Sequence, residues 1–230
     1  EDAARVNVLV DAYLAGTPLP YLFGEWDFFG LTLTVTPAVL IPRPESEKLV
    51  ELAADFLARN PDVSEFADVG TGSGCIAVSL LMHKSGSKVN ANLIDRSAAA
   101  LSVARLNLER YHVADRAALI QGHLTEPLSD QLHLVIANLP YIPSARIAML
   151  DVSANEPVEA LDGGEDGFML IDEMLRDLEQ KIVHPFLILC EIDDSHREIA
   201  LERASRSFPY ADVRVENDFA DKTRYLIISG

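Results

Sequence analysis

The stretch Asn138–Tyr141, with the sequence NLPY, combines residue types that can hold an amino group. It follows the apolar run 132–137, which predicts a buried strand. Pro140 fixes its own φ and pushes Leu139 toward an extended conformation, so the Leu139 carbonyl has a defined direction. The Asn138 side-chain oxygen and that carbonyl are two acceptors for one NH2 group, which the tyrosine ring can cover. The alternative is an ordinary strand-ending turn with a partly buried tyrosine.

A glycine-rich turn lies earlier in the chain, between a predicted strand over 65–70 and a predicted helix over 74–83. Its sequence, DVGTGSG, contains Gly70, Gly72 and Gly74. Glycines allow a tight turn and a close approach of the backbone to a ligand at a helix N-terminus. The pattern G-x-G-x-G also occurs in plain βα turns, and it differs from the G-x-G-x-x-G fingerprint of dinucleotide sites.

Asp95 ends the next predicted strand, 88–95, and lies 21 positions after Gly74. A carboxylate in that place suits two hydrogen bonds to ribose hydroxyls. The alternative is that Asp95 is the N-cap of the helix that follows, over 97–111, and one residue could serve both roles. Together with the glycine turn, Asp95 predicts a cofactor that contains a nucleoside.

Strands and helices alternate from residue 45 onward, which predicts an α/β fold with a doubly wound, mostly parallel sheet. The expected strands are 65–70, 88–95, 117–122, 132–138, 185–192, 212–218 and 223–229. The expected helices are 45–59, 74–83, 97–111, 168–182 and 195–208. No helix separates the last two strands, so we expect them to pair antiparallel at one edge. In a doubly wound order the first and fourth strands are neighbours, which places Asn138 beside the glycine turn.

The residues before this alternation have a different pattern. Residues 1–20 are typical of a helix end and a proline-containing linker, and 25–36 predicts a small hairpin. The segment PAVLIPRPESE is rich in proline, which predicts a rigid, extended loop. We divide the chain into a helical remnant and linker (1–20), a hairpin with its loop (21–44) and a main domain (45–230). The chain does not begin with Met, so we expect a preceding segment.

The composition argues against several classes of protein. Lys plus Arg is 19 and Asp plus Glu is 36, a formal net charge of −17, which disfavours a nucleic-acid substrate. No apolar run is long enough to predict a membrane span. Cys75 and Cys190 suit reduced thiols in a cytoplasmic protein, and the histidines show no metal-ligand spacing. We expect a cytoplasmic monomer without a metal or a membrane partner.

These motifs together resemble the HemK/PrmC type of protein-(glutamine-N(5)) methyltransferase, the family that modifies peptide chain release factors. The resemblance extends from about Leu14 to Gly230. It rests on YLFGEWDFFGLTLTVTPAVLIPRPESE, DVGTGSGCIAVSL, LIDRSAAALSVARLN, IANLPYIP and EPVEALDGGEDGF. It implies a Rossmann-like class I methyltransferase fold, S-adenosyl-L-methionine as cofactor and S-adenosyl-L-homocysteine as product. The implied substrate is the glutamine of the Gly-Gly-Gln motif of a release factor.

The resemblance also implies a role for each matched residue. The methionine part and the ribose of the cofactor would be held by Gly70, Thr71, Gly72, Ser73, Gly74 and Asp95. The substrate amide would be gripped by Asn138, Leu139, Pro140 and Tyr141. The methyl-transfer pocket would be lined by Pro42, Arg43, Pro44, Glu45 and Ser46. Leu124 would pack on the adenine, and Asn138 would also reach the cofactor.

Three departures from the family pattern leave other interpretations open. Leu139 replaces a proline, and Asn-Leu-Pro-Tyr is also the form found in rRNA adenine dimethyltransferases. His123 and Leu124 stand where the family usually has an acidic residue and often an aromatic one, and little of the family's N-terminal helical domain precedes the hairpin. The alternatives are an adenine N(6)-methyltransferase acting on rRNA or DNA and a degenerate cofactor-binding module without activity. The glycine spacing disfavours a nicotinamide oxidoreductase.

Overall fold

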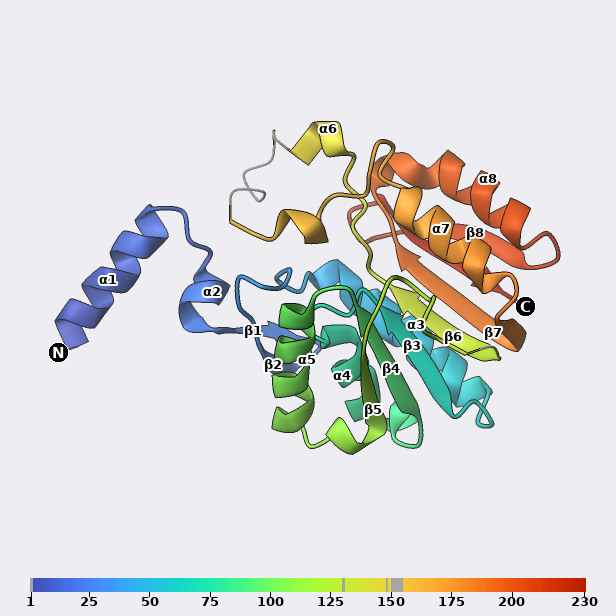
Figure 1. Ribbon diagram of the computed structural model, residues 1–230, viewed down its shortest axis with the longest axis horizontal. Coiled ribbons are helices and arrows are strands. Elements are labelled where there is room, and N and C mark those ends of the chain that lie inside the picture. The colour runs from blue at the N-terminus through green and yellow to red at the C-terminus, as the bar shows by residue number, and fades with distance from the viewer. Residues whose placement is uncertain (1, 130, 148, 150–154) are drawn as a thin grey trace.

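The computed structural model describes residues 2–129, 131–147, 149 and 155–230 (Figure 1). The strands of its main sheet are β3 (Glu65–Val69), β4 (Asn90–Asp95), β5 (Ala117–Gln121), β6 (Leu132–Ala137), β7 (Ile182–Glu191), β8 (Asp212–Asn217) and β9 (Thr223–Ser229). The helices packed on it are α3 (Glu47–Arg59), α4 (Cys75–Met82), α5 (Ala98–Arg110), α7 (Met169–Leu178) and α8 (Arg197–Ser207). The short elements are α6 (Ser144–Ile147), η1 (Pro44–Ser46), η2 (Lys84–Gly86), η3 (Ala114–Arg116), η5 (Val158–Ala160) and η6 (Asp194–His196).

The main sheet has seven strands in the order β5-β4-β3-β6-β7-β9-β8. The first five of these run parallel, and β9 runs antiparallel to both of its neighbours. The expected doubly wound sheet is therefore confirmed, as is the antiparallel pair at one edge. Val69 of β3 lies in register with Ala137 of β6, so the residues that follow these two strands meet at one edge of the sheet.

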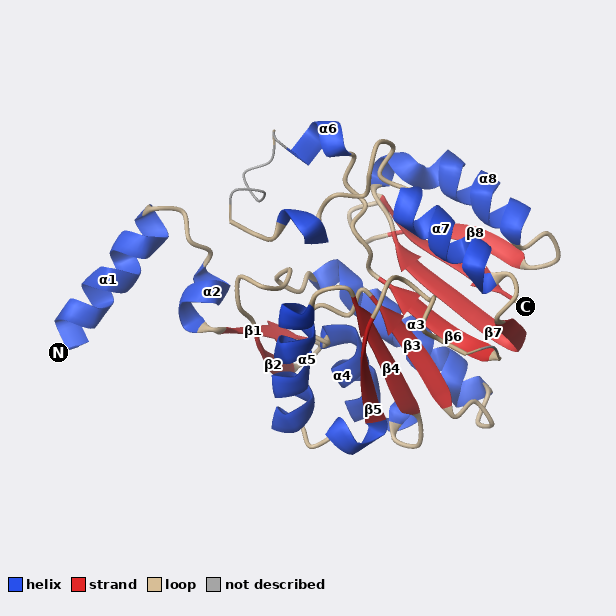
Figure 2. Cartoon of the chain, in the orientation of Figure 1, coloured by secondary structure: helices blue, strands red, loops and turns tan. Residues whose placement is uncertain are grey.

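Helices cover both faces of the sheet, and each face has its own apolar core (Figure 2). Residues of α3, α4 and α5 pack on one face, and residues of α7 and α8 pack on the other. Strand β3 serves both cores, because side chains alternate along a strand: Phe66 faces the first, and Ala67 and Val69 face the second. Packing on both faces holds the strands in place. It therefore also sets the positions of the residues that follow the strands.

One predicted boundary between a helix and a strand was wrong. The helix expected over 168–182 ends at Leu178, and β7 begins at Ile182 instead of residue 185. Ile182 lies four positions after Leu178, so helical spacing alone cannot separate it from the helix. It belongs to the strand because it pairs with Leu132 of β6.

The N-terminal part consists of α1 (Asp2–Leu14), α2 (Leu19–Phe23) and a hairpin of β1 (Glu25–Phe28) and β2 (Leu31–Thr34), as expected for 25–36. Helix α1 extends away from the sheet (Figure 1). The side chain of Asn107 on α5 ties the hairpin to the glycine turn: it accepts from the Thr34 amide, and its Nδ2 donates to the Thr34 and Ser73 carbonyls. Within the described ranges, every helix is too short or too polar to cross a membrane.

Candidate active site

A cavity lies at the carboxyl edge of the parallel strands, where the predicted motifs come together. The predicted residues that line it are Pro42, Arg43, Ser46, Gly70, Thr71, Gly72, Ser73, Asp95, Leu124, Asn138, Leu139 and Pro140. The predicted residues outside its lining are Pro44, Glu45, Gly74 and Tyr141. The structure therefore brings residues from five separate segments of the chain to one place.

The glycine turn between β3 and α4 needs glycine for two different reasons. Gly70, Gly72 and Gly74 have φ values of 73°, 56° and 76°, in the left-handed region that favours glycine. A Cβ on Gly70 would lie 2.9 Å from Leu139 Cδ2, and a Cβ on Gly74 would lie 3.2 Å from Ala104 Cβ. Gly70 and Gly74 thus also allow close packing, whereas a Cβ on Gly72 would meet only open space.

Asp95 links the end of β4 to the glycine turn. Its Oδ2 accepts a hydrogen bond from the Gly72 amide at 3.0 Å, and its Oδ1 accepts one from the Ser97 amide at 2.8 Å. Burial raises the pKa of Asp95, and these two N–H groups oppose that rise. The interpretation of Asp95 as the N-cap of the next helix was wrong, because Ser97 caps α5 by accepting from the Ala100 amide. The carboxylate of Asp95 instead forms part of the cavity wall.

Leu124 lies in the cavity wall after β5 and has an unusual backbone conformation. Its φ is 47°, which is uncommon for a residue other than glycine, and its side chain is buried. The neighbouring His123 also lines the cavity, and its Nε2 lies 3.1 Å from the exposed Glu173 carboxylate. Leu124 lines the cavity and adds an apolar surface to its wall. Its contact with an adenine stays a prediction.

The Asn138 amide has a defined orientation. Its Nδ2 donates to Ser46 Oγ at 2.9 Å and to Glu191 Oε2 at 3.1 Å. A carboxylate only accepts, so the network assigns nitrogen, and not oxygen, to the side facing Glu191. Both hydrogens of Nδ2 are used, and none of the described residues donates to Asn138 Oδ1. The Asn138 side chain can therefore offer a ligand one acceptor and no donor.

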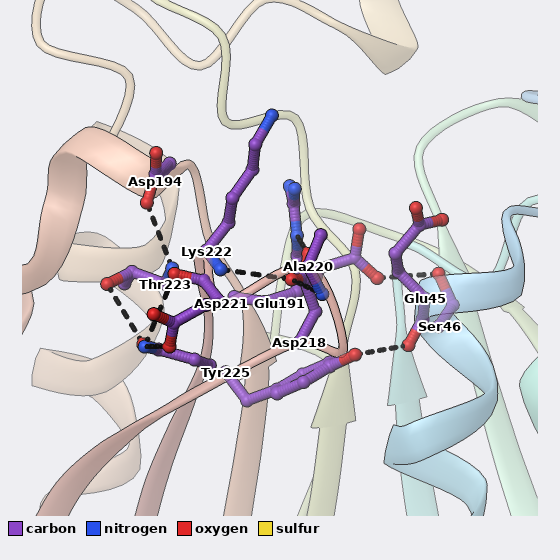
Figure 3. Close-up of polar contacts among 12 residues, drawn as sticks. Glu45, Ser46, Glu191, Asp194, Asp218, Ala220, Asp221, Lys222, Thr223 and Tyr225 are labelled. Carbon is purple, nitrogen blue, oxygen red and sulfur yellow. Dashed lines mark hydrogen bonds and ion pairs between the residues drawn. The ribbon is translucent and has the colours of Figure 1, made fainter.

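Glu191 is a site residue that the sequence reasoning missed. It ends β7, and its side chain is buried. It accepts from Ser46 Oγ at 2.5 Å and from the Tyr141 hydroxyl at 2.9 Å (Figure 3 shows Glu191 and Ser46). Burial raises the pKa of Glu191, opposed by the hydrogen bonds from Ser46 and Tyr141. The available signal was an acidic residue at the end of an apolar strand whose neighbour ends just before Asn138.

The proline-rich loop before α3 is held in place by contacts with distant segments. The buried Glu156 accepts from the Ile41 amide at 3.0 Å and pairs with the Arg43 guanidinium at 2.5 Å. At the other end of the loop, the Tyr225 hydroxyl donates to the Glu45 carbonyl at 2.8 Å (Figure 3). Prolines restrict the loop and these contacts anchor it, so it forms a fixed wall of the cavity.

Neither thiol has the features of a nucleophile or a metal ligand. Cys75 and Cys190 are both free, and burial raises the pKa of each to about 12. Among the described residues, no group of three or more His, Cys, Asp or Glu is placed to hold a metal ion. The polar groups that line the cavity are amides, hydroxyls and carboxylates, with the His123 imidazole and the guanidinium groups of Arg43 and Arg96.

Comparisons with known proteins place this cavity in a family. A model of the Methyltransferase small domain family matches residues 46–154. The release factor glutamine methyltransferase of Gloeobacter violaceus is 38% identical over 213 residues, which cover 91% of this chain and 73% of that protein. The chain belongs to the release factor glutamine methyltransferase family. The human MTRF1L release factor glutamine methyltransferase is 34% identical over 239 residues, covering 97% of this chain and 70% of that protein.

A solved structure supports the methyltransferase fold independently of close sequence similarity. The catalytic domain of human METTL16, solved in complex with the MAT2A 3'UTR hairpin 6, superposes with a TM-score of 0.68 at 16% identity. The likeness covers 87% of this chain and 76% of that domain. At this identity the likeness shows the fold of this chain and says nothing about its substrate.

Leu139, the departure from the family's Asn-Pro-Pro-Tyr, has a clear packing role in this family member. Its side chain is buried, and its Cδ2 atom lies 2.9 Å from the position that a Cβ on Gly70 would take. The strand-ending motif and the glycine turn therefore pack directly against each other. Pro140 still follows, so its restraint on the backbone of Leu139 remains.

Proposed function

We propose that this chain transfers a methyl group from S-adenosyl-L-methionine to the side-chain amide nitrogen of a glutamine in a peptide chain release factor. The proposed target is the glutamine of the Gly-Gly-Gln motif. One observation carries the proposal beyond family membership: Ser46 and Glu191 take both hydrogens of Asn138 Nδ2, which leaves Oδ1 as an acceptor. An acceptor without a competing donor is what an incoming NH2 group requires.

The cavity has the groups that the proposed cofactor needs. Gly72 faces open space, so the backbone of the glycine turn can approach the methionine part closely. Each Asp95 oxygen has one protein donor and keeps further acceptor capacity for a ribose hydroxyl. Leu124 adds an apolar surface for the adenine, and S-adenosyl-L-homocysteine would remain after transfer.

The proposed mechanism depends on position more than on acid–base chemistry. The bound cofactor supplies an electrophilic methyl group, and an amide nitrogen is a weak nucleophile because its lone pair is delocalised. Asn138 Oδ1 and the Leu139 carbonyl accept from the two N–H bonds of the substrate and aim the nitrogen at the methyl group. The same two oxygens stabilise positive charge as it develops on that nitrogen. The proton then leaves to water or to Asn138 Oδ1.

The variant Asn138→Ala tests the grip. We expect turnover to fall by about 10²–10³-fold or more, as for the loss of one preorganised group that stabilises the transition state. Cofactor affinity should change little, because the glycine turn and Asp95 remain. Asn90→Ala is the matched control, since Asn90 is exposed at the opposite end of β4. Turnover of Asn138→Ala equal to that of Asn90→Ala would sink this mechanism.

A second candidate, adenine N(6)-methylation of rRNA or DNA, is favoured by one feature. Leu139 gives the motif the form Asn-Leu-Pro-Tyr, and an adenine also presents an NH2 group on a flat ring. The net charge of −17 opposes binding of a polyphosphate. Radiolabelled cofactor should be incubated in parallel with a release factor, its Gly-Gly-Gln peptide and rRNA. We expect label in the release factor, and label in RNA alone would reverse the choice.

The proposal extends to the setting of the reaction. The release factor would be the protein partner, met in the cytoplasm by a monomer of this chain. Residues 1–20 would be the end of a helical domain, 21–44 the hairpin and loop that cover the cofactor, and 45–230 the methyltransferase domain. Size-exclusion chromatography with light scattering, with and without the release factor, measures both the oligomeric state and the complex.

A further inference from the structure

The ionised Glu191 carboxylate is the centre of a buried hydrogen-bond network in which the donor and the acceptor of each bond follow from the contacts. Ser46 Oγ accepts one hydrogen of Asn138 Nδ2, so the Ser46 hydroxyl hydrogen points to Glu191 Oε2. The second Nδ2 hydrogen goes to the same carboxylate oxygen, and the Tyr141 hydroxyl donates to Oε1. Three donors from two segments of the chain therefore converge on one acceptor-only group.

We infer that Glu191 is a positioning residue that fixes the Asn138 amide with its nitrogen turned inward and its oxygen turned to the cavity. The inference rests on the proposed function. An asparagine side chain can turn by about 180° about its last torsion and exchange its oxygen and nitrogen at little cost in shape. The turned amide would place a donor against the substrate NH2, where two donors repel. Glu191 excludes that state because its carboxylate cannot donate.

The same carboxylate also aligns two walls of the cavity. Ser46 belongs to η1, at the end of the proline-rich loop, while Asn138 and Tyr141 follow β6. All three are fixed to Glu191 at the end of β7, so the loop and the amine grip keep a constant separation. Loss of one of these hydrogen bonds would let the walls shift and would misplace the substrate nitrogen. Small misplacements of reacting atoms reduce rates strongly.

Charged and titratable groups from several neighbouring elements surround Glu191. Arg224 on β9 favours its ionised form, and Glu45 on η1 opposes it. Tyr141, Tyr225 and Cys75 are also nearby, and Glu191 contributes to raising the pKa of each of these groups. Protonation of Glu191 would turn one accepting oxygen into a hydroxyl and remove the uniform acceptor that Asn138 needs. We therefore expect kcat to fall at acid pH with the titration of Glu191.

Glu191→Gln tests the inference, with the exposed Glu202→Gln on α8 as matched control. A glutamine keeps the size of the side chain but places an NH2 group in the network, which permits the turned Asn138 amide. We expect kcat to fall by about 10²-fold, in the range for loss of one preorganised acceptor. Cofactor Kd and melting temperature should stay near those of Glu202→Gln, and the acid limb of the pH profile of kcat should disappear. A kcat within twofold of the control overturns the inference.

A second measurement needs neither turnover nor a variant that folds. In the wild-type protein without substrate, the side-chain NH2 signals of Asn138 should be well dispersed in a ¹H–¹⁵N spectrum and should titrate together with the Glu191 carboxyl carbon. NH2 signals that are averaged by rotation, or that ignore the Glu191 titration, contradict the inference. If wild type fails to methylate a release factor while these signals behave as expected, the proposed function fails and the positioning role stands.

Discussion

At the scale of the residue, the site depends on carboxylates that the fold has removed from water. Asp68, two positions before Gly70, is 1% exposed, and its Oδ2 accepts from Thr71 Oγ1 at 2.6 Å. Burial raises the pKa of Asp68 to about 6, although hydrogen bonds from Thr71 and the Ala77 amide oppose the rise. The folded protein therefore holds a proton on Asp68 more tightly than the unfolded chain does.

This shift makes the stability of the fold depend on pH. Between the ordinary pKa of 3.8 and the folded value of about 6, the folded state binds more protons, so the free energy of unfolding falls as pH rises. Above that window the loss from Asp68 amounts to about 3 kcal/mol, for a shift of about two units. Asp68→Asn mimics the protonated group, so it should be more stable than wild type at pH 8 and nearly equal at pH 4.

Urea unfolding of both proteins across this range measures the effect, with the exposed Asp55→Asn on α3 as control. The control should keep the wild-type pH dependence. Identical pH dependence in Asp68→Asn and wild type would contradict the assignment of a raised pKa to Asp68.

The sequence predicted some of the residues that form the site. The types and order of Gly70, Asp95 and Asn138 predict one cavity, because each follows a strand and parallel strands share an edge. The roles of Glu191 and Glu156 were not predicted because their partners are distant in the sequence. Asn138 and Glu191 are 53 positions apart, and Ile41 and Glu156 are 115 positions apart. No local pattern records which acidic residue closes a contact over such a distance.

At the scale of the element, the turn from β3 to α4 shows how packing and ligand space are set together. Two strands, β3 and β6, end side by side, and Leu139 fills the space that Gly70 leaves. The alternation of strands and helices predicted this neighbourhood correctly. It did not predict the end of α7, because an apolar residue at helical spacing can equally begin the next strand, as Ile182 does.

A pair of glycine variants separates backbone strain from crowding in this turn. Gly70 and Gly30 share a φ of 73°, but a Cβ on Gly30 meets nothing within 4 Å, whereas one on Gly70 lies 2.9 Å from Leu139 Cδ2. Gly30→Ala should cost about 1 kcal/mol of unfolding free energy from strain alone. Gly70→Ala should cost more unfolding free energy and should also weaken cofactor binding. Each ~1.4 kcal/mol lost from the binding free energy raises the Kd about tenfold.

Chemical denaturation and calorimetric titration with the cofactor measure the two effects in each variant. The double variant Gly70→Ala with Leu139→Ala should recover part of the cofactor affinity, since it removes the atom that the new methyl group meets. Equal cofactor affinity in Gly70→Ala and Gly30→Ala would mean that the contact with Leu139 does not shape the turn.

At the scale of the whole molecule, the acidic charge and the arrangement of the walls favour a protein substrate. The net charge is −17, which disfavours binding of nucleic acid and would favour the proposed cationic cofactor over its neutral product. The sheet supplies the side of the cavity proposed to hold the cofactor, and the loop fixed by Glu156 and Tyr225 supplies the other side. Membership of the release factor glutamine methyltransferase family and this geometry agree on an amide acceptor.

The most direct test of that account locates the transferred methyl group. The protein is incubated with S-adenosyl-L-methionine and an unmodified release factor, and the release factor is digested and sequenced by tandem mass spectrometry. The account predicts one added methyl group on the side-chain amide of the glutamine in the Gly-Gly-Gln motif, formed about 10²-fold or more slowly when Asn138→Ala replaces wild type. A methyl group on any other residue, or an unmodified glutamine after complete turnover on another substrate, would contradict it.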